Sequence, residues 1–164
     1  MKFNENLETA MEHLHKRGAF LTVKSGDKSN TMTISWGSVG FMWKKPVFMA
    51  LVRPSRYTYD LIENSDSFTV SIPYDDNMKK ALTICGTKSG RDIDKCAEAN
   101  IEFISSKEVS SPVVDNCNMY YECKILYKQA MDPALILDDS VEECYKGDNY
   151  HTLYYGEIVA CYEK

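Results

Sequence analysis

Apolar and polar residues alternate along much of this chain with the two-residue period of β-strands. Residues 30–36 place three apolar side chains on one side and three hydroxylated ones on the other: Met32, Ile34 and Trp36 against Thr31, Thr33 and Ser35. This alternation predicts a strand with one face in the core and one face of small hydroxylated side chains, which would let a planar ligand approach the backbone. Residues 20–23 and 68–72 predict further strands, and the apolar run 47–52 predicts a strand buried on both faces.

Helical periodicity is limited to short segments between these strands. Met78, Ala81, Leu82 and Cys85 have helical spacing, which predicts a helix that begins after residue 76 and stops at Gly86. Thr58 is a suitable N-cap for a helix to about Asn64, and residues 87–92 form a polar loop before a short helix that holds Lys95. The glycine-containing segment 37–40 predicts a flexible connection.

The second half of the chain contains strand patterns at residues 101–103, 119–127 and 153–161, separated by loops. Many short strands with few helices favour a closed, mostly antiparallel sheet, because closure removes exposed edges. The sequence therefore predicts a mainly β fold with short helices, arranged as a small barrel.

Length and charge narrow the classes of function. The chain has 164 residues without a linker or repeat, which predicts one domain over residues 1–164. A net charge of −5 argues against nucleic-acid binding, which needs a dominant basic face. Residues 1–12 are polar and acidic, unlike a secretory signal, and the longest apolar run is too short to span a bilayer. We expect a cytoplasmic protein that does not bind membranes.

The six cysteines do not predict a metal site. They stand at positions 85, 96, 117, 123, 144 and 161, with no Cys-x-x-Cys pair and no histidine beside a pair. We expect reduced thiols and no bound metal.

Positive charge gathers in two segments despite the acidic total. Arg53 and Arg56 lie in the segment 53–58, which also carries hydroxyls and suits a phosphate, and Lys88, Arg91 and Lys95 follow later. This contrast favours an anionic ligand. The alternative is that these side chains form surface ion pairs with Asp60, Asp92 and Asp94.

Taken together, these segments resemble the flavin reductase-like family, whose members bind FMN in a split β-barrel. The resemblance covers about residues 15–162. It is carried by residues 30–36, by residues 53–58 with the following helix and strand 68–73, by residues 85–95, and by the closing strand 151–158. It implies a split barrel of six to seven antiparallel strands with Greek-key-like connections.

The resemblance also implies a set of cofactor-binding residues. Residues 30–35 would offer backbone and hydroxyl groups to the isoalloxazine ring and ribityl chain, the segment 53–58 would bind the phosphate, and residues 89–95 would complete the site. Lys95 would reach the polar edge of the ring and raise its reduction potential. The candidates are Asn30, Thr31, Met32, Thr33, Ser35, Trp36, Arg53, Ser55, Arg56, Tyr57, Thr58, Ser89, Gly90, Arg91 and Lys95. No side chain is assigned a catalytic role, because the cofactor carries the chemistry.

The function implied by the resemblance is an FMN-dependent oxidoreductase. Electrons would pass from NAD(P)H through FMN to free flavin, a protein or a small acceptor, and the protein would be a homodimer with its flavin near the subunit interface. No dinucleotide-binding fingerprint is present, so NAD(P)H would bind transiently over the flavin. One alternative is a flavoredoxin-like carrier that exchanges electrons with a redox protein without NAD(P)H turnover. Another is a related barrel for a different ligand, such as haem or a nitroaromatic compound, in which His151 is a ligand.

Overall fold

Seven antiparallel strands form one sheet in the computed structural model, which describes residues 2–164 and so leaves out only the first residue of the acidic amino-terminal stretch. The strand order is β2-β1-β5-β8-β9-β4-β3. The strands are β1 (Ala19–Ser25), β2 (Lys28–Ile34), β3 (Gly37–Met42), β4 (Lys45–Val52), β5 (Ser67–Ile72), β8 (Met119–Ala130) and β9 (Thr152–Glu163). Two short strands, β6 (Phe103–Ile104) and β7 (Val113–Val114), pair separately.

The two edge strands of the sheet, β2 and β3, follow each other in the chain with only Ser35 and Trp36 between them. The sheet must therefore curl until its edges approach, although β2 and β3 do not pair. Helix α1 (Leu7–Arg17) contacts β3 and β5 and buries Ala10 and Leu14 in the interior. The result is a barrel that is split between β2 and β3.

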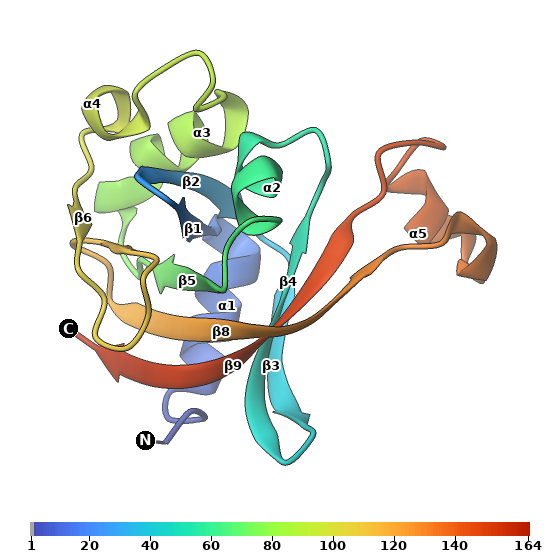
Figure 1. Cartoon of the computed structure of the whole chain (residues 1–164), viewed down its shortest axis with the longest axis horizontal. Coiled ribbons are helices and arrows are strands. Elements are labelled where there is room, and N and C mark those ends of the chain that lie inside the picture. The colour runs from blue at the N-terminus through green and yellow to red at the C-terminus, as the bar shows by residue number, and fades with distance from the viewer. Residues whose placement is uncertain (1) are drawn as a thin grey trace.

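Short helices pack against β1 and β2 (Figure 1). They are α2 (Tyr57–Ile62), the 3-10 turn η1 (Asp76–Met78), α3 (Lys79–Thr87) and α4 (Lys95–Ala99). A second apolar cluster lies between α3, α4 and the sheet, where Leu82 and Cys85 pack with Phe20 and Tyr120. This packing fixes the loop between α3 and α4 beside β2.

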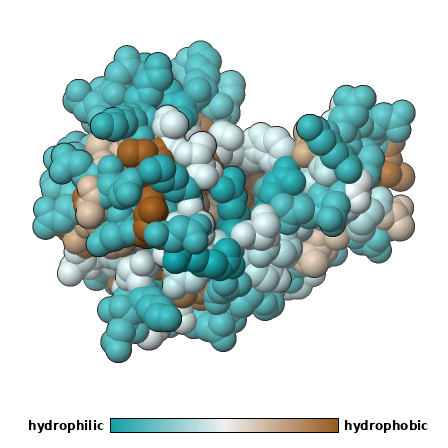
Figure 2. Space-filling model, turned by 90° about the horizontal axis from the view of Figure 1, so that it is seen from above, coloured by the Kyte–Doolittle hydropathy of each residue, from teal (hydrophilic) through white to brown (hydrophobic). Residues whose placement is uncertain are grey.

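Strands β8 and β9 are longer than the barrel needs and continue as a two-stranded ribbon to an arm, residues 131–150 (Figure 1). The arm contains η2 (Pro133–Leu135) and α5 (Asp139–Glu143). Figure 2 shows it as a lobe that stands off from the barrel. The chain returns from the arm at His151, immediately before β9, so the arm and the barrel meet beside this residue.

Three local expectations were wrong. Residues 37–40 belong to β3, since pairing with β4 orders them despite their two glycines. Trp36 was expected in the core but is 44% exposed, because β2 ends at Ile34. The N-cap of α2 is Arg56, and the buried Thr58 hydroxyl instead accepts a hydrogen bond from the Asn30 amide at 2.8 Å.

Candidate functional site

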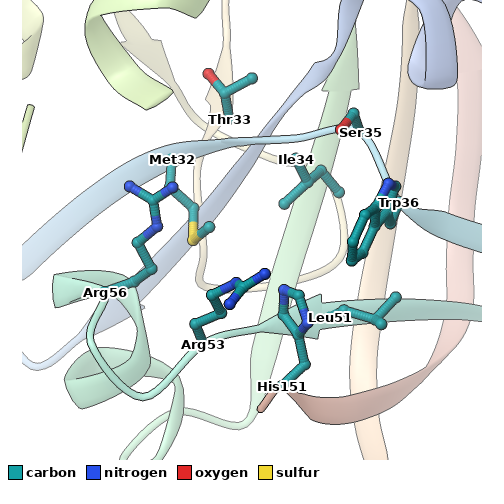
Figure 3. Close-up of a pocket in the computed structure, with 9 residues that line it drawn as sticks. All are labelled: Met32, Thr33, Ile34, Ser35, Trp36, Leu51, Arg53, Arg56 and His151. Atoms are coloured by element: carbon teal, nitrogen blue, oxygen red, sulfur yellow. The ribbon is translucent and has the colours of Figure 1, made fainter. Parts of the chain in front are cut away.

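A groove runs along β2 and consists of two adjoining hollows of about 180 Å³ each, which share Met32 and Arg56. One half, the Trp36 half, also contains Leu51, Arg53 and His151, and Figure 3 shows its side chains. The polar half is lined by residues of β2, α2 and the loop before α4: Asn30, Ser55, Tyr57, Thr58, Thr87, Lys88, Ser89, Arg91 and Lys95. Together the halves fall within the ~300–1,000 Å³ common for small-molecule sites.

The wall formed by β2 offers backbone groups rather than hydroxyls. The Thr31 hydroxyl donates to the Leu21 carbonyl and bonds the Thr22 hydroxyl, and the Thr33 hydroxyl donates to the Leu82 carbonyl at 2.6 Å. Figure 3 shows the Thr33 side chain directed away from Arg53 and His151. The expectation that these hydroxyls face a ligand was therefore wrong.

The apolar side chains of β2 are the ones that reach the groove. Met32 extends toward Arg53 and Arg56 in Figure 3. Since hydrogen-bonded pairs alternate along an antiparallel ladder and β2 pairs only with β1, the backbone N–H and C=O groups of Thr31 and Thr33 point to the free edge. The Thr31 carbonyl already accepts a hydrogen bond from Lys95 there. The free edge leaves the backbone groups of Thr33 for a flat polar ligand.

Three cations around the groove are bound by backbone carbonyls instead of carboxylates. Arg53 donates to the carbonyls of Cys144 and Asn149, and Arg56 donates to the Gly86 carbonyl at 2.8 Å. Lys95, only 7% exposed, donates to the carbonyls of Thr31 and Cys85 at 2.8 and 2.9 Å. Within residues 2–164 none of the three has an ion-pair partner. Their charge is available to an anion.

Burial lowers the pKa of Lys95, opposed by the nearby Cys85, and burial raises the pKa of the Cys85 thiol to about 11. The thiol therefore stays protonated at neutral pH and does not neutralise the ammonium. An ammonium has three hydrogens, and two are used by carbonyls. Because Lys95 lines the polar half of the groove, its third hydrogen is available to a ligand there.

The other two cations predicted for the site are already paired. Arg91 donates to the Asp60 carboxylate at 2.6 Å and lies over the Tyr57 ring, while Lys88 pairs with Glu98 at 2.8 Å. The pairing of Arg91 with Asp60 is one that the sequence had suggested as an alternative. These residues line the polar half with much of their charge neutralised.

Gly90 allows the loop before α4 to pack against β2. An added Cβ at this position would lie 2.1 Å from the Asn30 side-chain oxygen and 3.0 Å from a Tyr57 ring carbon. Asn30 is in turn bonded to Thr58, so β2, α2 and the loop meet at one buried polar contact. Ser89 accepts a hydrogen bond from the Arg91 backbone, and Ser55 accepts one from Asn149 of the arm. The structure thus brings the predicted residues to the two hollows of one groove, except Thr31, which is fully buried, and Gly90, which packs behind Asn30. Their roles in binding stay predictions.

His151 lies in the groove but was considered in the sequence only as a ligand in a different barrel. It is 9% exposed, and its ring lies 5.4 Å from that of Trp36. Burial, with the nearby Arg53 and Arg56, lowers its pKa to about 4, so the imidazole is neutral at pH 7. The pairing of Val52 with Thr152 brings Arg53 and His151 to the same end of the sheet. Knowledge of this register would have placed His151 in the site, but a single sequence does not reveal strand register.

Neither a metal centre nor a membrane-spanning helix is found in residues 2–164. No group of histidine, cysteine, aspartate and glutamate side chains is placed to hold a metal ion. No helix in this range has the length and apolar character needed to cross a bilayer.

Comparison with known proteins places the fold. A family described as "Flavin reductase like domain" matches residues 11–164. An uncharacterized protein of Archaeoglobus fulgidus is 28% identical over 149 residues, which cover 91% of this chain and 73% of the relative.

Solved structures show the same architecture. Flavoredoxin from Methanosarcina acetivorans is 25% identical, with a TM-score of 0.71 over 90% of this chain and 68% of that protein. An FMN-binding domain of a flavin reductase-like enzyme from Shewanella baltica is 18% identical, with a TM-score of 0.69 over 94% and 73%. A Streptomyces globisporus NADH:FAD oxidoreductase is 16% identical, with a TM-score of 0.67 over 90% and 75%. At these lower identities the likeness concerns the fold, and it confirms the predicted mainly β split barrel.

Proposed function

The chain belongs to the flavin reductase-like family, and we propose that it is an oxidoreductase that holds FMN in the groove along β2. The observation that carries the proposal is a set of three cations, Arg53, Arg56 and Lys95, which have no carboxylate partner among residues 2–164 and lie beside a free strand edge. A cofactor that joins a phosphate to a flat ring with polar edges matches both features. Bound FMN would supply the electron transfer.

The two halves of the groove suit the two ends of this cofactor. In the polar half, Arg56 and Lys95 are joined by the hydroxyls of Ser55 and Ser89, which suits the phosphate. In the Trp36 half, Met32, Leu51 and Trp36 provide contact surface for the ring, and the backbone of Thr33 can bond its polar edge. In this proposed arrangement Lys95 lies beside the phosphate, whereas the sequence analysis expected it at the polar edge of the ring. That expectation, with its effect on the reduction potential, stays a prediction.

A titration tests FMN binding directly. Purified apoprotein mixed with FMN should quench the flavin fluorescence with one-to-one stoichiometry. A charge-reversed double variant, Arg53→Glu with Arg56→Glu, should bind FMN at least about 100-fold more weakly, since each half of the groove loses a cation and repulsion of the phosphate is added. A wild-type protein that does not bind FMN at millimolar concentration would contradict the proposal.

The electron donor is proposed to be NAD(P)H. Support comes from a neighbour of this fold that is an NADH:FAD oxidoreductase. In an anaerobic stopped-flow experiment, the FMN-loaded protein should lose its yellow colour within seconds of mixing with NADH or NADPH. Free flavin, a protein or a small molecule would then accept the electrons.

A flavoredoxin-like carrier is the second candidate, and the 25% identity to the Methanosarcina acetivorans flavoredoxin favours it. A net charge of −5 would suit a redox-protein partner with a basic docking face. If the FMN-loaded protein is reduced slowly by NADH and NADPH but quickly by a reduced iron–sulfur protein, it is a carrier and not a reductase.

We further propose that the protein is a homodimer that pairs through an exposed aromatic cluster. Trp43, at the β3–β4 turn, is 54% exposed and lies 6.1 Å from Tyr127 and 5.8 Å from Tyr155, ring to ring. Phe41 and Met42, the last two residues of β3 before this turn, are also exposed, at 65% and 41%. Burial of such rings is a common basis of stable association. Analytical ultracentrifugation should show a dimer that Trp43→Glu converts to a monomer, whereas a wild-type monomer would contradict the proposal.

A further inference from the structure

The imidazole of His151 is held from behind by Tyr145, a residue of the arm. The Tyr145 hydroxyl lies 2.8 Å from His151 Nδ1, and Tyr145 is nearly buried. Figure 3 shows the imidazole extending from the start of β9 toward β2, between Arg53 and Trp36. No partner for Nε2 is found in residues 2–164, although this ring lines the groove. One ring nitrogen is therefore occupied by the arm and the other is free.

The chemistry of the Tyr145 hydroxyl decides which nitrogen carries the proton. The hydroxyl has one hydrogen and two neighbours, His151 Nδ1 and the Met131 sulfur at 3.2 Å. An unprotonated imidazole nitrogen is a much stronger acceptor than a thioether. Donation of this hydrogen to Nδ1 places the proton of the neutral ring on Nε2, whereas donation to the Met131 sulfur leaves Nδ1 protonated and donating to the hydroxyl.

The surroundings of Tyr145 hold its hydroxyl in this place. The ring stacks on Tyr150 at 4.8 Å, and the Arg53 guanidinium lies over it at 4.9 Å. The backbone N–H of Met131 donates to the His151 carbonyl at 2.9 Å, which ties the two sides of the arm together. The charged groups that face His151 are Arg53 from the end of β4 and Arg56 at the start of α2. Both oppose protonation of the ring.

We propose that Tyr145 is a positioning residue that keeps His151 in the neutral Nε2–H form, so that the groove presents a hydrogen-bond donor to a carbonyl oxygen. The inference rests on the proposed function, in which that oxygen belongs either to the flavin ring or to the carboxamide of a nicotinamide lying over it. A neutral donor suits this role because the groove is already strongly cationic, and it stabilises an oxygen that becomes more negative during electron transfer.

The form of the ring can be measured on the apoprotein by ¹⁵N NMR of the histidine side chains. In the wild type, His151 should show an unprotonated Nδ1 and a protonated Nε2. Tyr145→Phe keeps the stacking and removes the donor, so it should give a mixture of the two forms. Two matched controls should leave the signals unchanged. Tyr150→Phe removes a neighbouring hydroxyl that bonds Glu142 and not His151. Met131→Leu removes the sulfur that competes for the hydrogen of Tyr145. A protonated Nδ1 in the wild type would overturn the proposal, as would an unchanged spectrum in Tyr145→Phe.

Binding measurements then identify the oxygen. Loss of one hydrogen bond should change the relevant constant by about 2- to 12-fold. If the oxygen belongs to the flavin, Tyr145→Phe raises the Kd for FMN. If it belongs to the nicotinamide, the Kd for FMN is unchanged and KM for NAD(P)H rises. With both constants unchanged, the proposed role is wrong. Failure of the proposed function is distinguishable, because it would appear as absent FMN binding in the wild type.

Discussion

Cations of the groove and cations of the outer surface differ in what surrounds them. Lys16, Lys45 and Lys128 each contact a carboxylate on the surface. Within residues 2–164, the hydrogen bonds of Arg53, Arg56 and Lys95 go to backbone carbonyl oxygens and not to carboxylates. A carbonyl orients a cation without neutralising it, whereas a carboxylate removes the net charge. The groove is therefore a place of positive potential in a protein whose net charge is −5.

This difference separates residues of the same type into two roles. Surface pairs are worth about 0–1 kcal/mol of stability each, since solvent screens both partners. A carbonyl-bound cation in a groove can instead form a charge-assisted hydrogen bond with a ligand, worth about 1.5–3 kcal/mol. Substitutions on the two sides of this division should consequently have unequal effects.

Lys95→Met should have the largest effect, on folding. The substitution leaves the carbonyls of Thr31 and Cys85 without their donor in a buried place. The free energy of unfolding should fall by about 2–4 kcal/mol, because each buried orphan acceptor costs about 1–3 kcal/mol. Urea denaturation measures this loss. An unchanged midpoint would show that water replaces the ammonium and that Lys95 is not a structural cation.

Arg56→Ala should have the next largest effect, on binding. Removal of one unneutralised guanidinium should weaken FMN binding about 10- to 150-fold, in a titration at constant ionic strength. Lys16→Ala is the control, since Lys16 is paired with Glu12 on α1. If both variants bind FMN equally well, the distinction between cations bound by carbonyls and cations paired with carboxylates is wrong.

Gly90→Ala tests the contact that holds the polar half of the groove together. The new methyl group would collide with the Asn30 side chain, so the loop before α4 must move. We expect a loss of about 1–3 kcal/mol in the free energy of unfolding and weaker FMN binding. Gly40→Ala in β3 is a matched control, because an added Cβ there meets nothing within 4 Å. If both variants behave alike, close packing at Gly90 is not required.

The pH dependence of stability reports the burial of His151 and, after it, the field of the groove cations. The pKa of about 4 in the folded protein lies below the ~6.5 of an unfolded histidine. The unfolded chain therefore binds more protons between these values, so stability increases with pH across this window and is lost as the pH falls from about 6.5 toward 4. His151→Gln should flatten this dependence in urea titrations at pH 4.5 and 6.5. An unchanged slope would assign it to other groups.

The sequence predicted most of the barrel, because its strands follow simple alternation. It misplaced both ends of β2 by two residues, since it predicted a strand over residues 30–36 and the strand is Lys28–Ile34, so that Trp36 lies beyond its end. Threonines at alternate positions look like a polar ligand-facing surface. In the structure, however, the Thr31 hydroxyl donates to a carbonyl of β1 and the Thr33 hydroxyl donates to a carbonyl of α3. Alternation shows that two faces differ, and it does not show which face a helix covers.

The sequence predicted which residues form the candidate site, but not which of its cations are paired with a carboxylate. Arg53, Arg56, Arg91 and Lys95 were all named from the sequence, and all four lie around the groove. The pairing of Arg91 with Asp60, and the absence of such a partner for Arg56 within residues 2–164, depend on contacts between α2 and the loop before α4. His151 and Tyr145 depend on the register of β9 and on the arm, which no local pattern encodes.

Lys88→Ala should have the smallest effect, and it is the sharpest test of neutralisation because Lys88 itself lines the polar half of the groove. Its ammonium is paired with Glu98 at 2.8 Å on an exposed surface. We expect less than about a 3-fold change in the Kd for FMN and a change in unfolding free energy within about 1 kcal/mol. Glu98→Gln should act in the opposite direction and tighten FMN binding slightly, because it frees the Lys88 charge. If Lys88→Ala instead weakens binding as much as Arg56→Ala, proximity to the groove, and not the absence of a carboxylate partner, determines which cations bind the cofactor.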